Sequence, residues 1–191
     1  MSHQLSPDVI RILGKDGFVL KKSFLGEAEL AGLREECDRL VSDTRRAGVR
    51  GAYSSSSLIR GLVDDHFGLS KCLRWQGKMF RCLIFDKRPG SNWKVGWHQD
   101  INIKNVDGEI LPWERLGEVC TFRLHLDPTP ESNGALRVIP GSHLNGKGEN
   151  DSVSVVEAEP GDVLVLSPLL YHASSESSEP GHRRIIHVDY L

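Results

Sequence analysis

The chain from Met79 onward consists of short apolar or alternating segments separated by turn residues. Six of these segments have the length and pattern of β-strands, at 80–86, 119–126, 135–139, 153–158, 163–166 and 184–190. Proline-glycine pairs punctuate them, at Pro89-Gly90, Pro140-Gly141, Pro160-Gly161 and Pro180-Gly181. Proline presets φ, and glycine supplies the positive φ that tight turns need. The pattern predicts a mainly β fold of the jelly-roll type.

The amino-terminal part has a helical pattern instead. Apolar residues recur on one helical face from about residue 26 to 46, at Leu30, Leu33, Cys37, Leu40 and Val41. A shorter helix is expected to begin at Pro7, with a strand after it at 17–20. Residues 51–75 fit either a loop or a helix. A length of 191 residues suits a single domain, 1–191, with flanking helices in about 1–78 and the β core in about 79–191.

Composition narrows the class of protein. The 24 Lys and Arg against 26 Asp and Glu give a net charge of -2, and no basic run could track a phosphate backbone, so nucleic acid is not an expected partner. No apolar run approaches the ~20 residues that span a bilayer, and the first residues lack the order of a secretory signal. We therefore expect a cytoplasmic protein with no membrane partner, with reduced structural thiols at Cys37, Cys72, Cys82 and Cys120.

Three His-x-Asp motifs are candidates for metal chemistry, at His98-Gln99-Asp100, His125-Leu126-Asp127 and His187-Val188-Asp189. A non-haem Fe(II) site needs two imidazoles and one carboxylate on one side of the ion, and residues i and i+2 of a strand share a face. His187 has no later histidine to complete such a set. His125 leads into a proline-rich turn, where Asp127 is expected to bond its own backbone.

The motif at His98 has the better setting. It begins a long polar connection, and His172 lies 74 residues later, after a turn and a buried strand at 163–166. Arg183 follows His172 by eleven residues, and its planar guanidinium matches the carboxylate of an acid cosubstrate. We predict that His98, Asp100 and His172 are metal ligands and that Arg183 binds the cosubstrate.

Several longer stretches carry a family resemblance: Asp16-Gly17-Phe18-Val19, Trp97-His98-Gln99-Asp100, Asn133-Gly134-Ala135-Leu136 through Pro140-Gly141-Ser142-His143, Pro160-Gly161-Asp162 through His172, and Arg183-Arg184. With these stretches the chain resembles the phytanoyl-CoA dioxygenase family of iron and 2-oxoglutarate oxygenases. The resemblance implies a cupin-like double-stranded β-helix. It also implies that His98, Asp100 and His172 bind Fe(II), and that Arg183 and Ser174 hold 2-oxoglutarate.

The activity that the resemblance implies is a dioxygenase that uses dioxygen to hydroxylate a small-molecule substrate, with release of succinate and carbon dioxide. Halogenating relatives carry a small residue in place of the metal-binding carboxylate, so the retained Asp100 favours hydroxylation. Two alternatives stay open, a cupin-like Zn or Mn metalloenzyme and a non-catalytic 2-oxoglutarate-binding module. No partner protein is indicated.

Further binding candidates come from strand faces with period two. Thr121 shares a face with Arg123, and Arg81 shares one with Phe85 and Lys87. If these faces line the barrel interior, Thr121 is a candidate for binding the cosubstrate and Arg81 for binding the substrate.

Gln99, inside the metal motif, is another substrate-binding candidate. The polar stretch 101–118 fits either a lid over the site or a long surface loop. The remaining histidines are expected to be structural or exposed, at His3, His66, His143 and His182.

Overall fold

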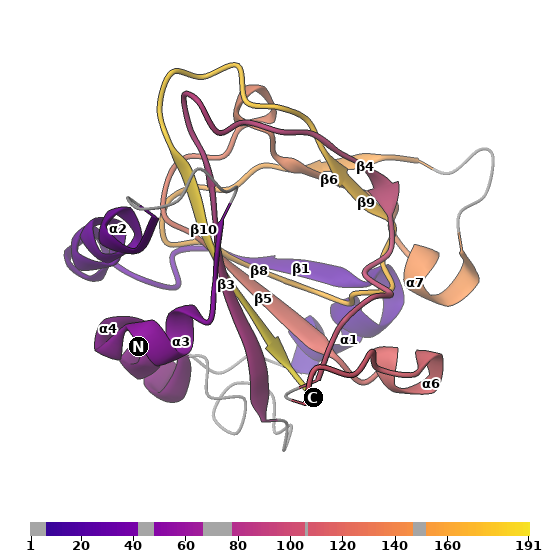
Figure 1. Ribbon diagram of the computed structural model, residues 1–191. Coiled ribbons are helices and arrows are strands. Elements are labelled where there is room, and N and C mark those ends of the chain that lie inside the picture. Colours follow the sequence, from indigo (N-terminus) through magenta and orange to yellow (C-terminus); the bar gives the residue numbers. More distant parts are fainter. Residues whose placement is uncertain (1–6, 42–47, 67–77, 106, 147–151) are drawn as a thin grey trace.

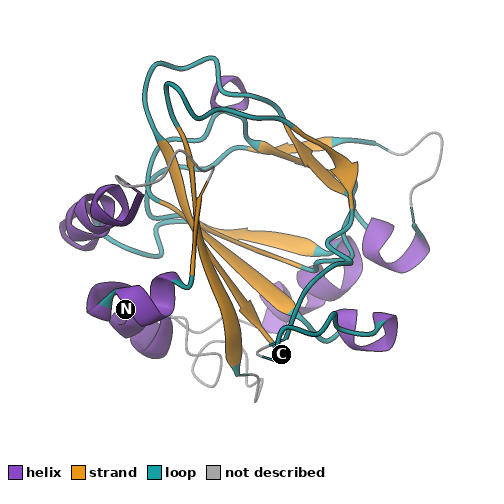
Figure 2. Ribbon diagram, viewed as in Figure 1, coloured by secondary structure: helices purple, strands orange, loops and turns teal. Residues whose placement is uncertain are grey.

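Two antiparallel β-sheets dominate the computed structural model, which describes residues 7–41, 48–66, 78–105, 107–146 and 152–191 (Figure 2). The larger sheet has the strand order β1 (Phe18–Lys21), β8 (Val163–Leu166), β5 (Cys120–His125), β10 (Arg183–Tyr190), β3 (Met79–Lys87) and β2 (Gly48–Arg50). The smaller sheet has the order β4 (Val95–His98), β9 (His172–Ser174), β6 (Leu136–Val138) and β7 (Ser154–Val156). The predicted mainly β jelly roll is confirmed.

Helices cover the outer face of the larger sheet. α2 (Glu27–Val41) contributes Leu30 and Leu33 to the main core, and α4 (Ser57–Gly61) contributes Ile59. Their partners include outward side chains of the sheet, Ile84, Phe122, Leu124, Val165, Ile186 and Val188. Each such side chain contributes about 1.5–3 kcal/mol when it is buried, which explains why the apolar face of α2 docks here. In Figure 1, α2, α3 (Ala52–Ser55) and α4 lie on the same side of the molecule.

The other helical segments are α1 (Pro7–Asp16), η1 (Leu62–His66), α6 (Trp113–Leu116), η2 (Glu131–Asn133) and α7 (Ser142–Asn145). The region 51–75, which the sequence left open, is helical in α3, α4 and η1, and residues 67–77 lie outside the described ranges. Ser56 caps α4, since its hydroxyl accepts a hydrogen bond of 3.1 Å from the amide of Ile59. One serine of the 54–57 run therefore helps to begin a helix.

A second apolar cluster lies between the two sheets. Leu164 and Leu166 of β8 meet Leu136 and Val138 of β6, together with Val156 of β7. Because this cluster joins the inner faces of both sheets, it fixes the distance between them. The segment 101–118, predicted as a lid or a loop, is anchored in a third cluster by Ile103, Leu111 and Leu116.

The inner face of the larger sheet is polar where it would ordinarily be apolar. Phe122 and Leu124 of β5 belong to the outer core, so their neighbours along the strand face inward. The inward residues of β5 and β10 are Thr121, Arg123, His125, Arg183, Ile185, His187 and Asp189. The strand register places His187 directly opposite Arg123. Burying a polar side chain costs free energy unless the side chain is hydrogen-bonded or binds a ligand. This row of buried polar side chains therefore indicates a functional site between the two sheets.

The six predicted strands are confirmed with ends shifted by at most two residues. The long helix, predicted to about residue 46, is described to Val41, and 42–47 lie outside the described residues. The early strand spans Phe18–Lys21. Three strands are absent from the prediction, β2, β4 and β9. Two of them, β4 and β9, carry His98 and His172, so the sequence pattern missed the elements that position the site.

The cysteines agree with the expectation of buried thiols. Cys37, Cys82 and Cys120 are free and buried, and Cys72 lies outside the described residues. Burial raises the pKa of the Cys82 and Cys120 thiols to about 12, which keeps both protonated. Across the helices that the structure describes, none has the length and apolar character needed to cross a membrane.

Candidate metal centre and its pocket

His98, Asp100 and His172 come together where two short strands pair. His98 is the last residue of β4 and His172 is the first of β9, and the antiparallel register makes these two residues direct partners. The two imidazole rings lie 4.2 Å apart, centroid to centroid. The amide of Asp100 donates a 2.9 Å hydrogen bond to the carbonyl of Pro168, which ties the chain after β4 to the segment before β9. His98 and His172 are therefore neighbours in the fold although 74 residues separate them in sequence.

The three side chains present ligand atoms that all lie within 4.8 Å of one another, and such a group could hold a metal ion. His98 Nε2 is 3.4 Å from one oxygen of Asp100, and His172 Nε2 is 3.9 Å from the other. Each Nδ1 lies 2.8 Å from a backbone carbonyl two residues earlier, Gly96 for His98 and Leu170 for His172. A carbonyl can only accept, so in the neutral form of each imidazole Nδ1 carries the proton and Nε2 has its lone pair free for an ion.

The electrostatics of the cluster also suit a cation. Burial opposes ionisation of Asp100, but the hydrogen bond from His98 and the positive charge that His172 carries once it is protonated in acid outweigh it and hold the pKa of Asp100 well below its usual range. The hydrogen bond to Asp100 raises the pKa of His98. Burial lowers the pKa of His172 to about 4, so this imidazole is neutral at physiological pH. The cluster therefore presents one ionised carboxylate and one neutral imidazole before any ion arrives.

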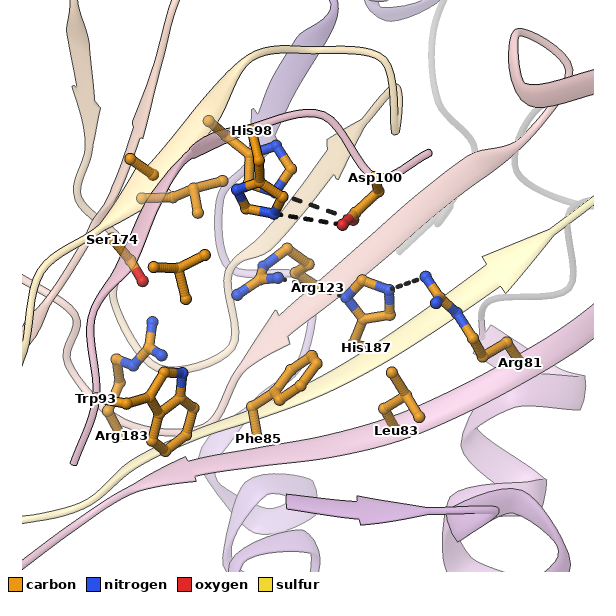
Figure 3. A pocket seen from close by; sticks show the side chains of 14 residues that line it. Arg81, Leu83, Phe85, Trp93, His98, Asp100, Arg123, Ser174, Arg183 and His187 are labelled. Atoms are coloured by element: carbon orange, nitrogen blue, oxygen red, sulfur yellow. Dashed lines mark hydrogen bonds and ion pairs between the residues drawn. The ribbon is translucent and has the colours of Figure 1, made fainter. Parts of the chain in front are cut away.

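A pocket between the sheets opens onto this cluster (Figure 3). Apolar side chains make part of its wall, from Leu83, Phe85, Trp93, Val95, Leu136 and Ala173. Its polar wall adds to the cluster the residues Arg81, Arg123, Ser174, Arg183 and His187. Of the binding residues predicted from the sequence, Arg183, Ser174 and Arg81 thus lie at the same pocket as the three candidate ligands.

Arg183 is the predicted cosubstrate residue, and it is buried with an exposure of 3%. Its Nη1 donates a 3.1 Å hydrogen bond to the carbonyl of Gly134, while its buried Nε has no hydrogen-bond partner. Gly134 has φ +68°, and a Cβ there would lie 2.6 Å from the carbonyl oxygen of Ser175. The glycine of the Asn-Gly-Ala-Leu stretch is therefore required by the backbone that holds Arg183. The unpaired Nε fits a carboxylate ligand.

Thr121 and Gln99 are not among the residues that line the pocket. The Thr121 hydroxyl donates a 2.6 Å hydrogen bond to buried Asp189, deeper in the sheet. Gln99 lies between two inward residues of an extended segment, so its side chain turns the other way and donates to the carbonyl of Leu169. Arg81 lines the pocket and also forms an ion pair with Asp189.

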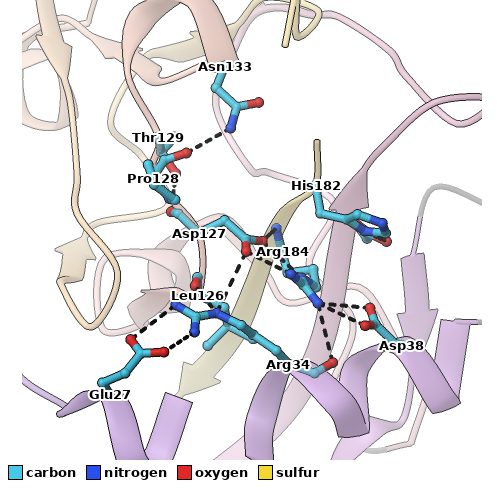
Figure 4. Close-up of polar contacts among 11 residues, drawn as sticks. Glu27, Arg34, Asp38, Leu126, Asp127, Pro128, Thr129, Asn133, His182 and Arg184 are labelled. Atoms are coloured by element: carbon cyan, nitrogen blue, oxygen red, sulfur yellow. Dashed lines mark hydrogen bonds and ion pairs between the residues drawn. The ribbon is translucent and has the colours of Figure 1, made fainter. Parts of the chain in front are cut away.

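The residues of the His125 motif make structural contacts away from the metal cluster. His125 is buried, and its Nδ1 lies 3.0 Å from the Thr129 hydroxyl. The expectation that Asp127 bonds its own backbone is wrong. Its carboxylate instead accepts hydrogen bonds from Arg184, at 2.8 Å from the amide, 2.9 Å from Nε and 2.8 Å from Nη2 (Figure 4). Thr129, whose hydroxyl donates to the carbonyl of Asp127, makes the local turn contact.

The carboxylate of the third motif is also already paired. Asp189 forms an ion pair with Arg81, accepts a hydrogen bond from Thr121 and lies 3.1 Å from Nε2 of His187. His187 nevertheless lines the pocket, as does Arg123, and neither is among the predicted site residues. The period-two face shared by Thr121 and Arg123 was the available signal. Of the other histidines, His182 pairs with Asp86 at 3.1 Å, and His143 Nε2 lies 3.2 Å from the carbonyl of Gly14.

Comparison with known proteins places this geometry in context. Residues 49–185 match the family model described as phytanoyl-CoA dioxygenase. The dioxygenase andF of Emericella variicolor is 26% identical over 201 residues, which cover 93% of this chain and 70% of that protein.

Solved structures of other proteins share the fold. The non-heme, alpha ketoglutarate dependent epimerase SnoN from nogalamycin biosynthesis aligns with a TM-score of 0.82 at 19% identity, covering 96% of this chain and 81% of that one. HygX from Streptomyces hygroscopicus, solved with nickel and 2-oxoglutarate bound, aligns with a TM-score of 0.76 at 18% identity, covering 98% and 87%. At these identities the structural matches bear on the architecture alone.

Proposed function

The chain belongs to the phytanoyl-CoA dioxygenase family, and on this premise we propose that it is an Fe(II)- and 2-oxoglutarate-dependent dioxygenase that hydroxylates a small-molecule substrate. The observation that carries the proposal is the cluster of His98, Asp100 and His172 at a pocket that also contains the buried Arg183. Two imidazoles and one carboxylate on one side of an ion are the ligand set of non-haem Fe(II) oxygenases.

His98, Asp100 and His172 would hold the iron, and Arg183 with Ser174 would hold the far carboxylate of 2-oxoglutarate. The buried and unpaired Nε of Arg183 supports this fit, because a guanidinium without a carboxylate partner is costly inside a protein. When bound, Fe(II) and 2-oxoglutarate supply the oxidising chemistry: dioxygen is split, 2-oxoglutarate becomes succinate and carbon dioxide, and one oxygen atom enters a C–H bond of the substrate.

The part of the protein in this reaction is binding, orientation and exclusion of water. The carbonyls of Gly96 and Leu170 fix both imidazoles with Nε2 toward the site. The low pKa of Asp100 keeps its carboxylate ionised as a ligand. Leu83, Phe85 and Leu136 make an apolar wall that limits water around the reacting groups.

Hydroxylation is the outcome that we favour because Asp100 is retained. A carboxylate at this position occupies a coordination site that halogenating relatives leave free for halide. The fold is shared with proteins that catalyse other reactions, such as the epimerase SnoN, so the product must be measured. A substrate that gains one oxygen atom supports hydroxylation, whereas a product of unchanged mass would indicate an epimerase.

Turnover of 2-oxoglutarate tests the proposal directly. The Fe(II) protein, incubated with 2-oxoglutarate, dioxygen and a library of metabolites, is expected to release succinate, with one substrate raising the rate above the uncoupled background. An Asp100→Ala protein serves as the control for succinate formed by free iron. Absence of succinate with every substrate, in a protein that still binds a metal, would favour the cupin-like Zn or Mn enzyme. Binding of 2-oxoglutarate without turnover would favour the non-catalytic module.

Metal affinity is expected to depend on pH through His98. The pKa of His98 lies above 6.5 in the metal-free protein, and a metal requires the neutral imidazole, so protons compete with the metal below that pKa. Between pH 6.5 and pH 4, affinity for Mn(II) should fall by about tenfold for each pH unit. His172, with a pKa of about 4, adds a second competing proton only below pH 4. Calorimetric titrations at several pH values measure this slope, and a hundredfold change per unit in this window would contradict the environment assigned to His172.

A further inference from the structure

Arg123 is a buried cation at the pocket, and the proposed roles of the metal cluster and of Arg183 do not account for it. It lies in the middle of β5, a strand with neighbours on both sides, and its side chain points inward with 9% of the residue exposed. Figure 3 shows its guanidinium between the His98–Asp100 pair on one side and Arg183 on the other. Both arginines line the same pocket.

The contacts of this guanidinium are weak: its Cζ lies 5.7 Å from the centre of the Phe85 ring. Nη1 of Arg123 lies 3.4 Å from Nδ1 of His187, and the buried Nε has no partner. Within the residues that the structure describes, no carboxylate forms an ion pair with Arg123 or with Arg183. Arg81 differs, because it is paired with Asp189. Unpaired buried charges cost several kcal/mol, so two of them facing one pocket indicate that a ligand supplies the missing negative charge.

The charged side chains around Arg123 indicate which part of the ligand carries the negative charge. Burial lowers the pKa of Arg123, and the charges of Asp100 and Asp189 offset that shift only in part. Burial and the charge of Arg123 lower the pKa of Arg183 to about 9. The two arginines therefore repel each other across the pocket, and Arg123 is the one on the side of the metal cluster. A ligand with one carboxylate near the metal cluster and a second one farther away would neutralise the charges of both arginines.

We propose that Arg123 binds the carboxylate of 2-oxoglutarate adjacent to its keto group, while Arg183 binds the distal carboxylate. This inference rests on the proposed function. Depth in the pocket favours the cosubstrate over the substrate as the partner of Arg123. Arg123 and Arg183 are both buried, at 9% and 3% exposure, whereas the Arg81 side chain is 21% exposed and lies closer to solvent. The cosubstrate is thus held between two arginines, one at each end.

Two keto acids distinguish the roles of the two arginines. 2-Oxoglutarate has both carboxylates, and 2-oxopentanoate has the same length and keto acid end but no distal carboxylate. Their dissociation constants are measured by titration of the anaerobic Fe(II) protein, followed by the metal-to-ligand absorption band and by calorimetry. Arg183→Met should abolish the preference for 2-oxoglutarate over 2-oxopentanoate. Arg123→Met should weaken both acids by a similar factor of about 10 to 100 and leave the preference intact.

Control variants separate binding from folding. Arg184→Met removes a neighbouring arginine of β10 whose guanidinium binds Asp127 instead of facing the pocket, and it should leave both keto acid affinities unchanged. Arg123→Lys keeps the charge and should recover part of the lost affinity for both acids. It also carries the test if Arg123→Met does not fold, in which case its own affinities are compared with those of the wild type.

The outcomes decide between this inference and its premise. If Arg123→Met, or Arg123→Lys where the former does not fold, binds both acids as the wild type does, Arg123 is not a cosubstrate residue. If it loses only the preference for 2-oxoglutarate, Arg123 is a second residue for the distal carboxylate, and the inference is also wrong. If the wild-type Fe(II) protein binds neither acid, the proposed function itself fails.

Discussion

Replacing His98 with alanine is expected to abolish Fe(II) binding. The cluster has three protein ligands, and His98 supplies one of its two imidazoles and the hydrogen bond to Asp100. Removal of a group that only orients a ligand commonly costs 10- to 100-fold in metal affinity, so loss of a ligand should cost more than about 100-fold. Anaerobic titration with Fe(II), and with Mn(II) as an air-stable substitute, measures the loss.

His125→Ala is the matched control for this prediction, because His125 also belongs to a His-x-Asp motif and is more deeply buried than the half-buried His98. Its imidazole contacts Thr129, and burial with the nearby Arg123 charge lowers its pKa well below the ordinary value. The variant should bind Fe(II) as tightly as the wild type and lose about 1–3 kcal/mol of unfolding free energy. Equal loss of iron from the His98 and His125 variants would refute the assignment of the cluster.

The predicted fold depended on signals that are local in the sequence. Strands such as Val163–Leu166 and Arg183–Tyr190 are apolar or alternating runs, and their pattern is sufficient to find them. β4 and β9 were missed because their sequences, VGWH and HAS, contain no apolar run such as the VLVL of β8. Their pairing depends on contacts between residues that are far apart in sequence.

The candidate site divides in the same way. His98, Asp100, His172 and Arg183 were selected from spacing and from a family resemblance, and the structure brings all four to one pocket. Arg123 shares a predicted strand face with Thr121, but the sequence does not reveal that one side chain reaches the pocket and the other bonds Asp189. Which of the two side chains reaches the pocket depends on where along β5 the smaller sheet packs against the larger one.

The error at Asp127 has a physical cause. An aspartate before Pro-Thr-Pro commonly bonds its own turn, and local sequence favours that reading. In the structure a charged partner from β10 competes for the carboxylate, and three charge-assisted or backbone hydrogen bonds from Arg184 outweigh one local bond. Arg184 is 57 residues away in sequence, so only the tertiary fold could indicate the contact.

Because of those contacts, Asp127→Ala is expected to lower the free energy of unfolding by about 3–5 kcal/mol. The Asp127 side chain is 11% exposed, and its removal leaves the 12%-exposed guanidinium of Arg184 with Asp38 as its remaining carboxylate partner. The backbone amide of Arg184 also loses its acceptor. Urea unfolding of the metal-free protein at pH 7 measures the change.

Asp38→Ala is the control, since Asp38 binds the same guanidinium from the other side at 2.9 Å but is 52% exposed. Exposed ion pairs contribute up to about 1 kcal/mol, so this variant should unfold close to the wild type. Asp127→Ala should still bind Fe(II) once folded, because its carboxylate faces Arg184 and Arg34 and does not belong to the metal cluster. Similar small losses in both variants would show that the Asp127–Arg184 contact does not stabilise the junction of β5 and β10. Loss of iron from a folded Asp127→Ala protein would reopen the choice among the three His-x-Asp motifs.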